Sequence, residues 1–239
     1  MRASSWCVRC RFLKTTLPVL FGMMLEVDTD LARWDAKDAP ANRPCNNFNV
    51  GREGLQRVGE AIGHHTFIPI AFAIINNFLT KSEWVYKHAA LMALSEFTYL
   101  LPDDHVEGLT VVADQVLPHT ADADPRVQYA ALNALGMLCT DQHPVIQLHR
   151  HETIVPAIQA CMKSKSARVR AHAAGALVNF LEGSFDMMMA PYVDTLLADL
   201  YTLLSTGPVM VQEHAMNALT VLADTCGDEF GRLCVWCGA

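Results

Sequence analysis

The polar side chains best suited to binding chemistry recur at fixed spacing around four copies of one short sequence phrase. The set consists of Glu96, Tyr99, Asn133, Thr140, Asn179, Glu182, Asn217 and Asp224. It holds three carboxylates and three asparagines but no lysine or arginine. Carboxylates attract ammonium and guanidinium groups, and asparagine amides can hydrogen-bond to a peptide backbone. The set therefore predicts a surface for an extended basic peptide, and a merely solvated helix face is the alternative interpretation.

The elements that must position these side chains are helices that recur with a nearly constant period. The four phrases close on Leu94, Leu135, Leu177 and Leu219, at intervals of 41, 42 and 42 residues. This period is typical of paired-helix HEAT or armadillo units. A unit this small cannot bury its apolar face alone, so neighbouring units must stack. We therefore predict an all-α fold, an α-α superhelix formed by a HEAT-repeat solenoid.

Each predicted hairpin pairs a first helix with a second helix that carries the phrase. The predicted second helices cover residues 83–100, 125–140, 167–182 and 209–225. First helices are predicted over 104–118, 151–163 and 187–205, and a separate pair of helices over 52–63 and 66–79. Ser82 is the predicted N-cap of the helix that begins at residue 83.

The closing leucine of each phrase divides its helix into two faces. In the second, third and fourth phrases, the positions three and four residues away from it are apolar, Met216 included, and form the predicted core stripe. The eight acceptors lie two residues before, two after or five after a closing leucine, on the opposite face. Stacked at one repeat per layer, they predict a strip of acceptors along one wall of the solenoid.

Arginines at the start of second helices need partners, because a cation at a helix N-terminus opposes the helix dipole. Arg126, Arg168 and Arg170 are in this position, with Asp122 and Asp124 just before the first of them. We predict an Asp–Arg ladder that links neighbouring repeats, and anion binding is the alternative.

The composition divides the chain into four predicted segments. These are an irregular N-terminus over 1–16, a helix plus acidic loop over 17–51, the repeats over 52–227 and an irregular C-terminus over 228–239. The first segment is basic without an acid, which is typical of a ragged end or of a transit peptide. The acidic loop holds Asp28, Asp30, Asp35 and Asp38. Because no capping repeat closes the array, we expect the chain to belong to something longer.

Charge and hydropathy argue against two further classes of partner. The 239-residue chain has a formal net charge of −7 and no basic stripe, so direct binding to nucleic acid is not expected. It has no apolar run of the roughly 18 residues that a transmembrane helix needs, so no membrane span is predicted. The eight scattered cysteines are typical of small buried thiols in a reducing compartment.

No arrangement of residues predicts an enzyme, a metal site or a cofactor. A HEAT-type deoxyhypusine hydroxylase binds two irons through several His-Glu pairs, whereas His151-Glu152 is the single such pair in this sequence. Cys7/Cys10 and Cys234/Cys237 could in principle close one zinc site. Because these pairs lie at opposite ends of an elongated solenoid, we predict two chance pairs instead.

The amino-acid sequence of the repeats resembles that of a known family. Residues 124–136 and 168–182 resemble the importin-β (karyopherin-β) superfamily, and the nearest branch is importin-5, or importin-β3. Residues 84–95 are similar to the same branch, and the Asp-rich loop around Trp34 is similar to an acidic insertion in it. Because the family's chains are several times longer, the resemblance implies a partial chain of about four to five repeats.

The resemblance implies a segment of a nuclear transport receptor. Such receptors bind basic nuclear-localisation signals of cargo proteins on the concave wall of second helices, where the eight acceptors are predicted. Ran-GTP and phenylalanine-glycine (FG) nucleoporins are further implied partners, and cytoplasm and nucleus are the implied locations. A generic HEAT-repeat scaffold, such as a phosphatase regulatory subunit, remains the alternative.

Overall fold

The computed structural model describes residues 2–35, 46–102 and 105–227, with side chains from residue 8 onward. The chain divides into two compact units, unit 1 (Met1–His105) and unit 2 (Val106–Ala239). Within the described ranges, no residue lies in a β-strand. Each helix in these ranges is too short or too polar to cross a lipid bilayer.

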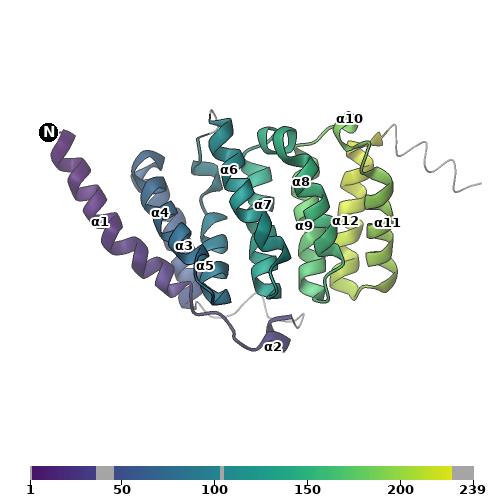
Figure 1. Ribbon diagram of the computed structural model, residues 1–239, viewed down its shortest axis with the longest axis horizontal. Coiled ribbons are helices and arrows are strands. Elements are labelled where there is room, and N and C mark those ends of the chain that lie inside the picture. The colour runs from purple at the N-terminus through teal and green to yellow at the C-terminus, as the bar shows by residue number, and fades with distance from the viewer. Residues whose placement is uncertain (1, 36–45, 103–104, 228–239) are drawn as a thin grey trace, which may run out of the picture. The chain divides into compact units, whose positions relative to one another are not determined.

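Unit 1 consists of two hairpins, and an insertion separates the two helices of the first. Its elements are α1 (Arg2–Met23), α2 (Leu31–Asp35), α3 (Asn47–Ile62), α4 (His64–Leu79), α5 (Trp84–Leu94) and the 3₁₀ helix η1 (Thr98–Leu100). Helix α3 packs most extensively on α1, and α4 packs most extensively on α5 (Figure 1). The prediction that 52–63 and 66–79 form one pair is therefore wrong, although α3 also contacts α4. The insertion that holds α2 concealed the true partner of α3.

Helix α1 covers a region that the sequence predicts to be irregular. Residues 1–16 were assigned to a ragged end because they are basic, whereas α1 is helical from Arg2. Leu13, Leu17 and Phe21 are fully buried, and their four-residue spacing places them on one face of the helix. Exposed basic residues alternate with this stripe in the sequence and conceal it.

Aromatic rings join the helices of unit 1. Phe97 lies edge-to-face with Phe67 at 5.1 Å between ring centroids. Phe78 makes the same type of contact with Phe21 at 5.7 Å and with Tyr86 at 5.1 Å. Edge-to-face pairs stabilise a core beyond the area that they bury. The rings of Phe21, Phe78 and Tyr86 thus connect α1, α4 and α5, and the Phe67–Phe97 pair joins α4 to the segment after α5.

Unit 2 contains three hairpins whose second helices lie side by side. Its elements are α6 (Val106–Val116), η2 (Leu117–Ala121), α7 (Pro125–Asp141), α8 (Val145–Met162), α9 (Ala167–Glu182), α10 (Asp186–Met189), α11 (Val193–Thr206) and α12 (Val209–Thr225). Helix α9 packs between α7 and α12, and in the other row α8 contacts both α6 and α11 (Figure 1). The structure confirms the predicted second helices 167–182 and 209–225, and α7 ends one residue later than predicted. The predicted first helix 187–205 is in fact two helices, α10 and α11.

Side-chain caps set the starts of α7 and α9, but not of α5 and α12. The hydroxyl oxygen of Ser166 accepts a hydrogen bond from the backbone N–H of Val169 at 3.1 Å, which caps α9. The predicted cap at Ser82 is wrong, because α5 begins at Trp84 and Glu83 is its N-cap residue. The Ser82 hydroxyl donates to the Glu83 carboxylate at 3.3 Å instead.

In unit 2, one side chain of each phrase also forms a hydrogen bond with the backbone just before its second helix. Gln128, Arg170 and Gln212 occupy the same position in three successive phrases. Each side chain donates at 2.8 Å to a backbone carbonyl located six to eight residues earlier. Each second helix thus satisfies a carbonyl that its own hairpin would otherwise leave unpaired.

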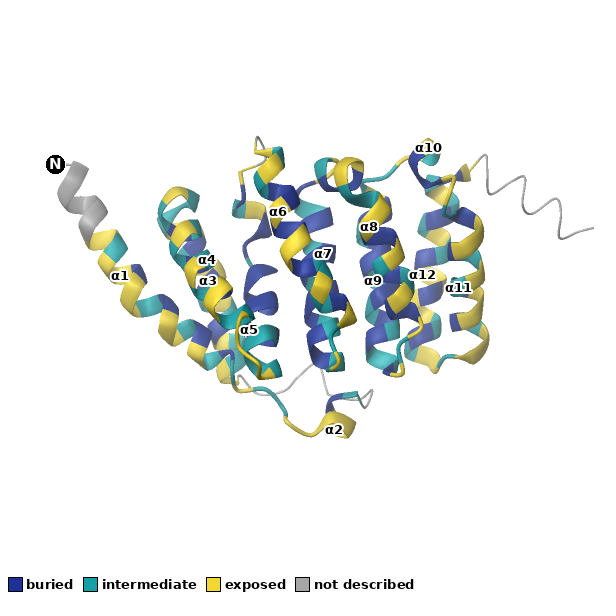
Figure 2. Cartoon of the chain, viewed as in Figure 1, coloured by how far each residue is buried: buried dark blue, intermediate teal, exposed yellow. Residues whose placement is uncertain are grey.

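Small residues and leucines form the core between the second helices of unit 2. Leu135 and Leu177 are fully buried, as are most phrase residues of α7 and α9 (Figure 2). A Cβ added at Gly136 would lie 3.6 Å from the Cα of Ala176, so α7 and α9 approach closely there. The predicted core position Met216 is 53% exposed, because α12 is the last described helix and no further layer covers it.

Candidate functional site

The acceptors on α9 and α12 form the most accessible part of the predicted strip. Glu182, Asn217 and Asp224 are exposed and Asn179 is half-buried. Within the described part of the chain, the carboxylates of Glu182 and Asp224 form no ion pair and no hydrogen bond. Because α9 packs directly on α12, two unneutralised carboxylates lie on neighbouring helices. Such a pair can bind two cationic side chains of one extended peptide.

The acceptors on α7 are less accessible. Asn133 and Thr140 are half-buried, and the Thr140 hydroxyl donates to the Gly136 carbonyl of its own helix at 3.1 Å. The amide nitrogen of Asn179 would lie 3.0 Å from a Cβ added at Gly136, so Asn179 extends across the gap between α9 and α7. These residues can supply hydrogen-bond acceptors beside the carboxylates but no charge.

In unit 1 the predicted acceptors have partners within the unit. The Nε of Arg52 donates to Oε1 of Glu96 at 2.7 Å, and the guanidinium also forms an ion pair with this carboxylate. The Tyr99 hydroxyl donates to the carboxylate of Glu60 at 3.0 Å. Met92, at the equivalent position of the same face, is buried. The expectation of a strip without positive charge is therefore wrong at Glu96, because only second helices carrying the phrase were considered and Arg52 belongs to α3.

Cationic and aromatic side chains occupy the N-terminal half of the same face in unit 2. The guanidinium carbon of Arg168 lies 4.9 Å from the centroid of the Tyr129 ring, and Tyr129 stacks on His172 at 4.1 Å. Arg168 lies nine residues, or about two and a half turns, before Leu177, which places it on the acceptor face. The face therefore changes from positive to negative along α9. The same periodicity, extended by about two turns towards the helix start, reveals this from the sequence.

His172 is neutral at physiological pH. Burial first, and then the charges of His214 and Arg168, lower its pKa to about 4. Its ring links two layers of the unit, because it stacks on Tyr129 of α7 and belongs to α9. The stack is thus an uncharged spacer between the Arg168 guanidinium and the core.

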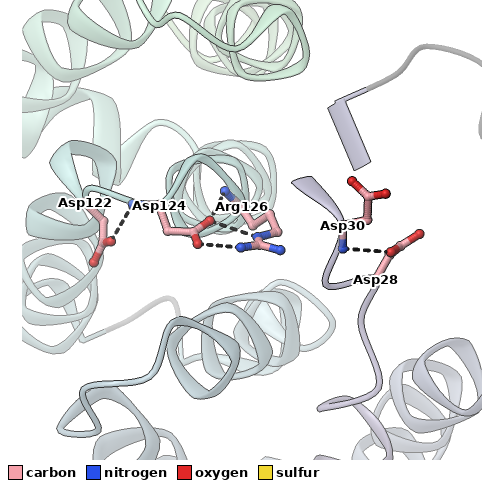
Figure 3. A network of polar contacts seen from close by, with 5 residues as sticks. All are labelled: Asp28, Asp30, Asp122, Asp124 and Arg126. Carbon is pink, nitrogen blue, oxygen red and sulfur yellow. Dashed lines mark hydrogen bonds and ion pairs between the residues drawn. The ribbon is translucent and has the colours of Figure 1, made fainter. Parts of the chain in front are cut away.

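Arg126 and Arg170, at the starts of α7 and α9, form hydrogen bonds within their own repeats. The Asp124 carboxylate accepts hydrogen bonds from the Arg126 backbone N–H at 2.9 Å, from its Nε at 3.0 Å and from its Nη2 at 2.7 Å (Figure 3). Arg170 donates to backbone carbonyls of the turn before α9. These contacts do not form the predicted ladder between repeats. Arg168 does reach the neighbouring layer, but it contacts an aromatic ring rather than an aspartate.

The described part of the acidic loop uses its carboxylates to organise α2. Asp28 accepts a hydrogen bond from the Asp30 backbone N–H at 3.0 Å (Figure 3). Asp30 in turn accepts from the backbone N–H groups of Ala32 and Arg33 at 3.0 and 3.2 Å. These aspartates therefore act as turn and cap residues. Asp38 lies outside the described residues.

The first helices of unit 2 are tied together by polar contacts. The Arg150 guanidinium forms two parallel hydrogen bonds of 2.8 Å with the Asp114 carboxylate, which joins α8 to α6. The His151 ring nitrogen Nδ1 lies 2.9 Å from the Tyr192 hydroxyl. His151 thus has a structural partner. Among the described residues, no three metal-ligating side chains lie together.

The cysteines of unit 2 that the sequence places in helices are buried. Burial raises the pKa of Cys139 and of Cys161 to about 12, so both thiols are protonated at neutral pH. The Cys161 thiol donates to the Thr120 carbonyl at 3.3 Å. Of the two cysteine pairs, the side chain of Cys7 and the whole 228–239 segment lie outside the described residues.

Comparison with known proteins gives consistent matches. A family of HEAT-like repeats matches residues 125–180. Importin subunit beta-3 of Saccharomyces cerevisiae is 34% identical over 221 residues, which is 91% of this chain and 20% of that protein. The crystal structures of Kap121p and of Kap121p bound to Pho4p each align with a TM-score of 0.87 and 33% identity. Each alignment covers 92% of this chain and 22% of the Kap121p chain.

These matches confirm the predicted all-α superhelix of HEAT repeats and the predicted family resemblance. The chain spans about one fifth of the length of the relatives that it matches. The repeat boundaries 52–227 stay a prediction, because the HEAT-like family match covers only part of that range.

Proposed function

We propose, from the homology of this chain to the importin-β family, that it is a segment of a nuclear transport receptor that binds basic nuclear-localisation signals. The binding surface is the acceptor face of α9 and α12, with Asn179, Glu182, Asn217 and Asp224 as its principal residues. The observation that carries this proposal is the pair of exposed, unneutralised carboxylates on adjacent second helices. Cytoplasm and nucleus are the proposed locations.

Solved complexes of the related Kap121p support a protein-binding role. Kap121p has been solved bound to Pho4p, to the extreme C-terminus of the phosphatase Cdc14p and to Nup53p. For this chain, which matches one fifth of that protein, partners of this kind are part of the proposal. Ran-GTP and FG nucleoporins are further proposed partners of the complete receptor.

The charges and their exposure set the expected strength of binding. An exposed ion pair contributes about 0.2–1 kcal/mol and is screened by salt. Two such pairs, together with hydrogen bonds from Asn179 and Asn217 to the peptide backbone, are individually weak, so we expect salt-sensitive binding no tighter than roughly the micromolar range. Arg168 at the other end of the face repels a cationic peptide, so the basic residues should settle over the C-terminal halves of α9 and α12.

Fluorescence anisotropy with a labelled lysine-rich peptide tests the proposal. The double variant Glu182→Gln/Asp224→Asn should bind about tenfold more weakly, because it removes both carboxylates without changing the side-chain shapes. The matched control is Glu152→Gln/Asp194→Asn, which removes two exposed carboxylates from α8 and α11 in the other row of helices. The control should change the affinity by less than about twofold.

The alternative function, a generic HEAT-repeat scaffold, predicts a different result. Equal losses in the two double variants would indicate attraction by net charge alone. The absence of any binding by the unmodified chain at low salt would remove the signal-binding role and leave the scaffold.

A further inference from the structure

We propose that Arg52 is a built-in competitor that occupies the Glu96 carboxylate and so withholds this acceptor from basic peptides. The inference rests on the proposed function, because it concerns which acceptors a basic signal can reach. It assigns a specificity-determining role to a residue outside the repeated phrase.

The geometry places the Arg52 guanidinium where a ligand's cation would have to bind. Its Nε donates to Oε1 of Glu96 at 2.7 Å, and its Nη2 forms an ion pair with the same oxygen. The side chain of Glu96 is only 13% exposed, whereas that of Arg52 is 34% exposed. The arginine therefore covers the carboxylate and is itself the part that solvent reaches.

The packing around Arg52 favours this arrangement. The Asn46 side chain caps α3 by accepting from the Asn49 backbone N–H at 2.9 Å, which fixes the first turn of the helix. The Phe48 ring centroid lies 6.0 Å from the Arg52 guanidinium carbon, at the edge of cation–π range. Contacts within α3 therefore help to hold the Arg52 side chain in the orientation that reaches Glu96.

The competition follows from the chemistry of the two cations. A lysine or arginine of a bound peptide would form the same type of charge-assisted hydrogen bond that Arg52 already forms. An intramolecular partner has a high effective concentration, so a weakly binding peptide cannot displace it efficiently. The affinity that Glu96 could contribute is multiplied by the fraction of molecules in which Glu96 is uncovered, so a small fraction means a small contribution.

Removal of Arg52 should turn Glu96 into an additional binding residue. Without Arg52 the Glu96 carboxylate loses both its partner and its cover, so a cation of the peptide can form a charge-assisted hydrogen bond with it. We expect Arg52→Ala to tighten the binding of a lysine-rich peptide by about threefold to tenfold. A peptide in which every lysine is replaced by glutamine should show no such gain.

A matched control separates this effect from the general loss of a positive charge. Arg57 lies on the same helix, its side chain is 80% exposed, and it pairs only loosely with Glu53 at 3.8 Å. Arg57→Ala should therefore change the affinity by less than about twofold. The double variant Arg52→Ala/Glu96→Gln should return to the affinity of the unmodified chain, and far-UV circular dichroism verifies that each variant is folded.

Each result of these titrations has a defined meaning. A gain for Arg52→Ala that disappears in the double variant supports the competitor, even if the unmodified chain binds too weakly to measure. A gain no larger than that of Arg57→Ala, or one that persists without the Glu96 carboxylate, overturns it. In that case measurable binding by the unmodified chain leaves the proposed function intact, whereas no binding by the unmodified chain or by Arg52→Ala overturns both proposals.

Discussion

Units 1 and 2 carry the same repeated phrase but use the opposite helix face differently. In unit 1, Glu96 is paired with Arg52 and Tyr99 with Glu60. In unit 2, Glu182 and Asp224 have no such partners among the described residues. The position of a carboxylate on its helix is therefore not enough to make it a binding residue. The neighbouring helix decides whether the charge is available.

The cores of the two units also differ in the side chains that form them. Unit 1 is joined by edge-to-face aromatic rings, whereas unit 2 depends on leucines and on small residues that let helices approach closely. The second arrangement repeats from layer to layer, and the first does not. Four changes test how far this contrast extends, in order of decreasing effect.

Phe97→Ala should destabilise unit 1 far more than unit 2. The ring is fully buried against Phe67, so its removal should cost about 3–5 kcal/mol. Urea unfolding followed by tryptophan fluorescence reports mainly on unit 1, because Trp34 and Trp84 both lie there. Phe185→Ala, at a 47% exposed ring in unit 2, is the control. An equal drop in amide-exchange protection across both units would contradict the division into separate cores.

Acidification should weaken unit 2 through His172. The pKa is about 4 in the folded chain and about 6.5 in the unfolded chain, so the unfolded state gains the proton first as pH falls. This contribution to stability is complete above pH 6.5 and is lost as the pH falls towards 4, by about 1–3 kcal/mol. His172→Phe should keep the stack on Tyr129 and remove this loss. Urea unfolding by circular dichroism at two pH values measures it, and exposed His149→Gln should behave like the unmodified chain.

Glu96→Gln should affect the stability of unit 1 more than it affects binding. The change leaves the Arg52 guanidinium without its carboxylate, which should cost about 1 kcal/mol. Peptide affinity should change by less than about twofold, because Arg52 already occupies this acceptor. Tryptophan-detected unfolding and anisotropy titration measure the two effects. A loss of affinity as large as that of the Glu182/Asp224 double variant would remove the contrast between the units.

Asp114→Asn should have the smallest effect. Its hydrogen bonds with Arg150, and then the charge of that guanidinium, hold the pKa of the Asp114 carboxyl below its ordinary value. Stability from this pair is present above the unfolded pKa of about 3.9 and is lost as pH falls through the lower folded value. Because Asp114 is half-exposed, we expect at most about 0.5 kcal/mol at neutral pH. The difference from the unmodified chain should vanish in about 1 M salt, and a difference that persists would mean that the side chain acts through packing.

The sequence predicted the second helices of unit 2 well because their signals are local, whereas the predicted helix 83–100 is in fact α5 followed by the 3₁₀ helix η1. Ser166 and Asp124 cap α9 and α7, and the phrase repeats with a period that only stacked hairpins explain. The pairing of α3 with α1 was not predictable in the same way. The two helices are separated by an insertion, and periodicity gives no information about which helix packs across it.

The candidate site was predictable only in part. Periodicity placed Glu182 and Asp224 on one helix face, and the structure leaves both exposed. It could not reveal that Arg52 covers Glu96, because this contact joins α3 to the turn after α5, which belongs to the next repeat. The cationic half of the face, marked by Arg168, follows from the same periodicity but lies about two turns before the acceptor positions.

The turn-closing side chains of unit 2 have a consequence for how such an array can change in length. Gln128, Arg170 and Gln212 each bond to a carbonyl of their own hairpin, so every hairpin brings its own turn chemistry. A block of 42 residues could be duplicated or deleted between equivalent turns without stranding a buried carbonyl. Whole repeats can therefore be inserted or deleted, and the change in stability comes from the contacts between neighbouring layers.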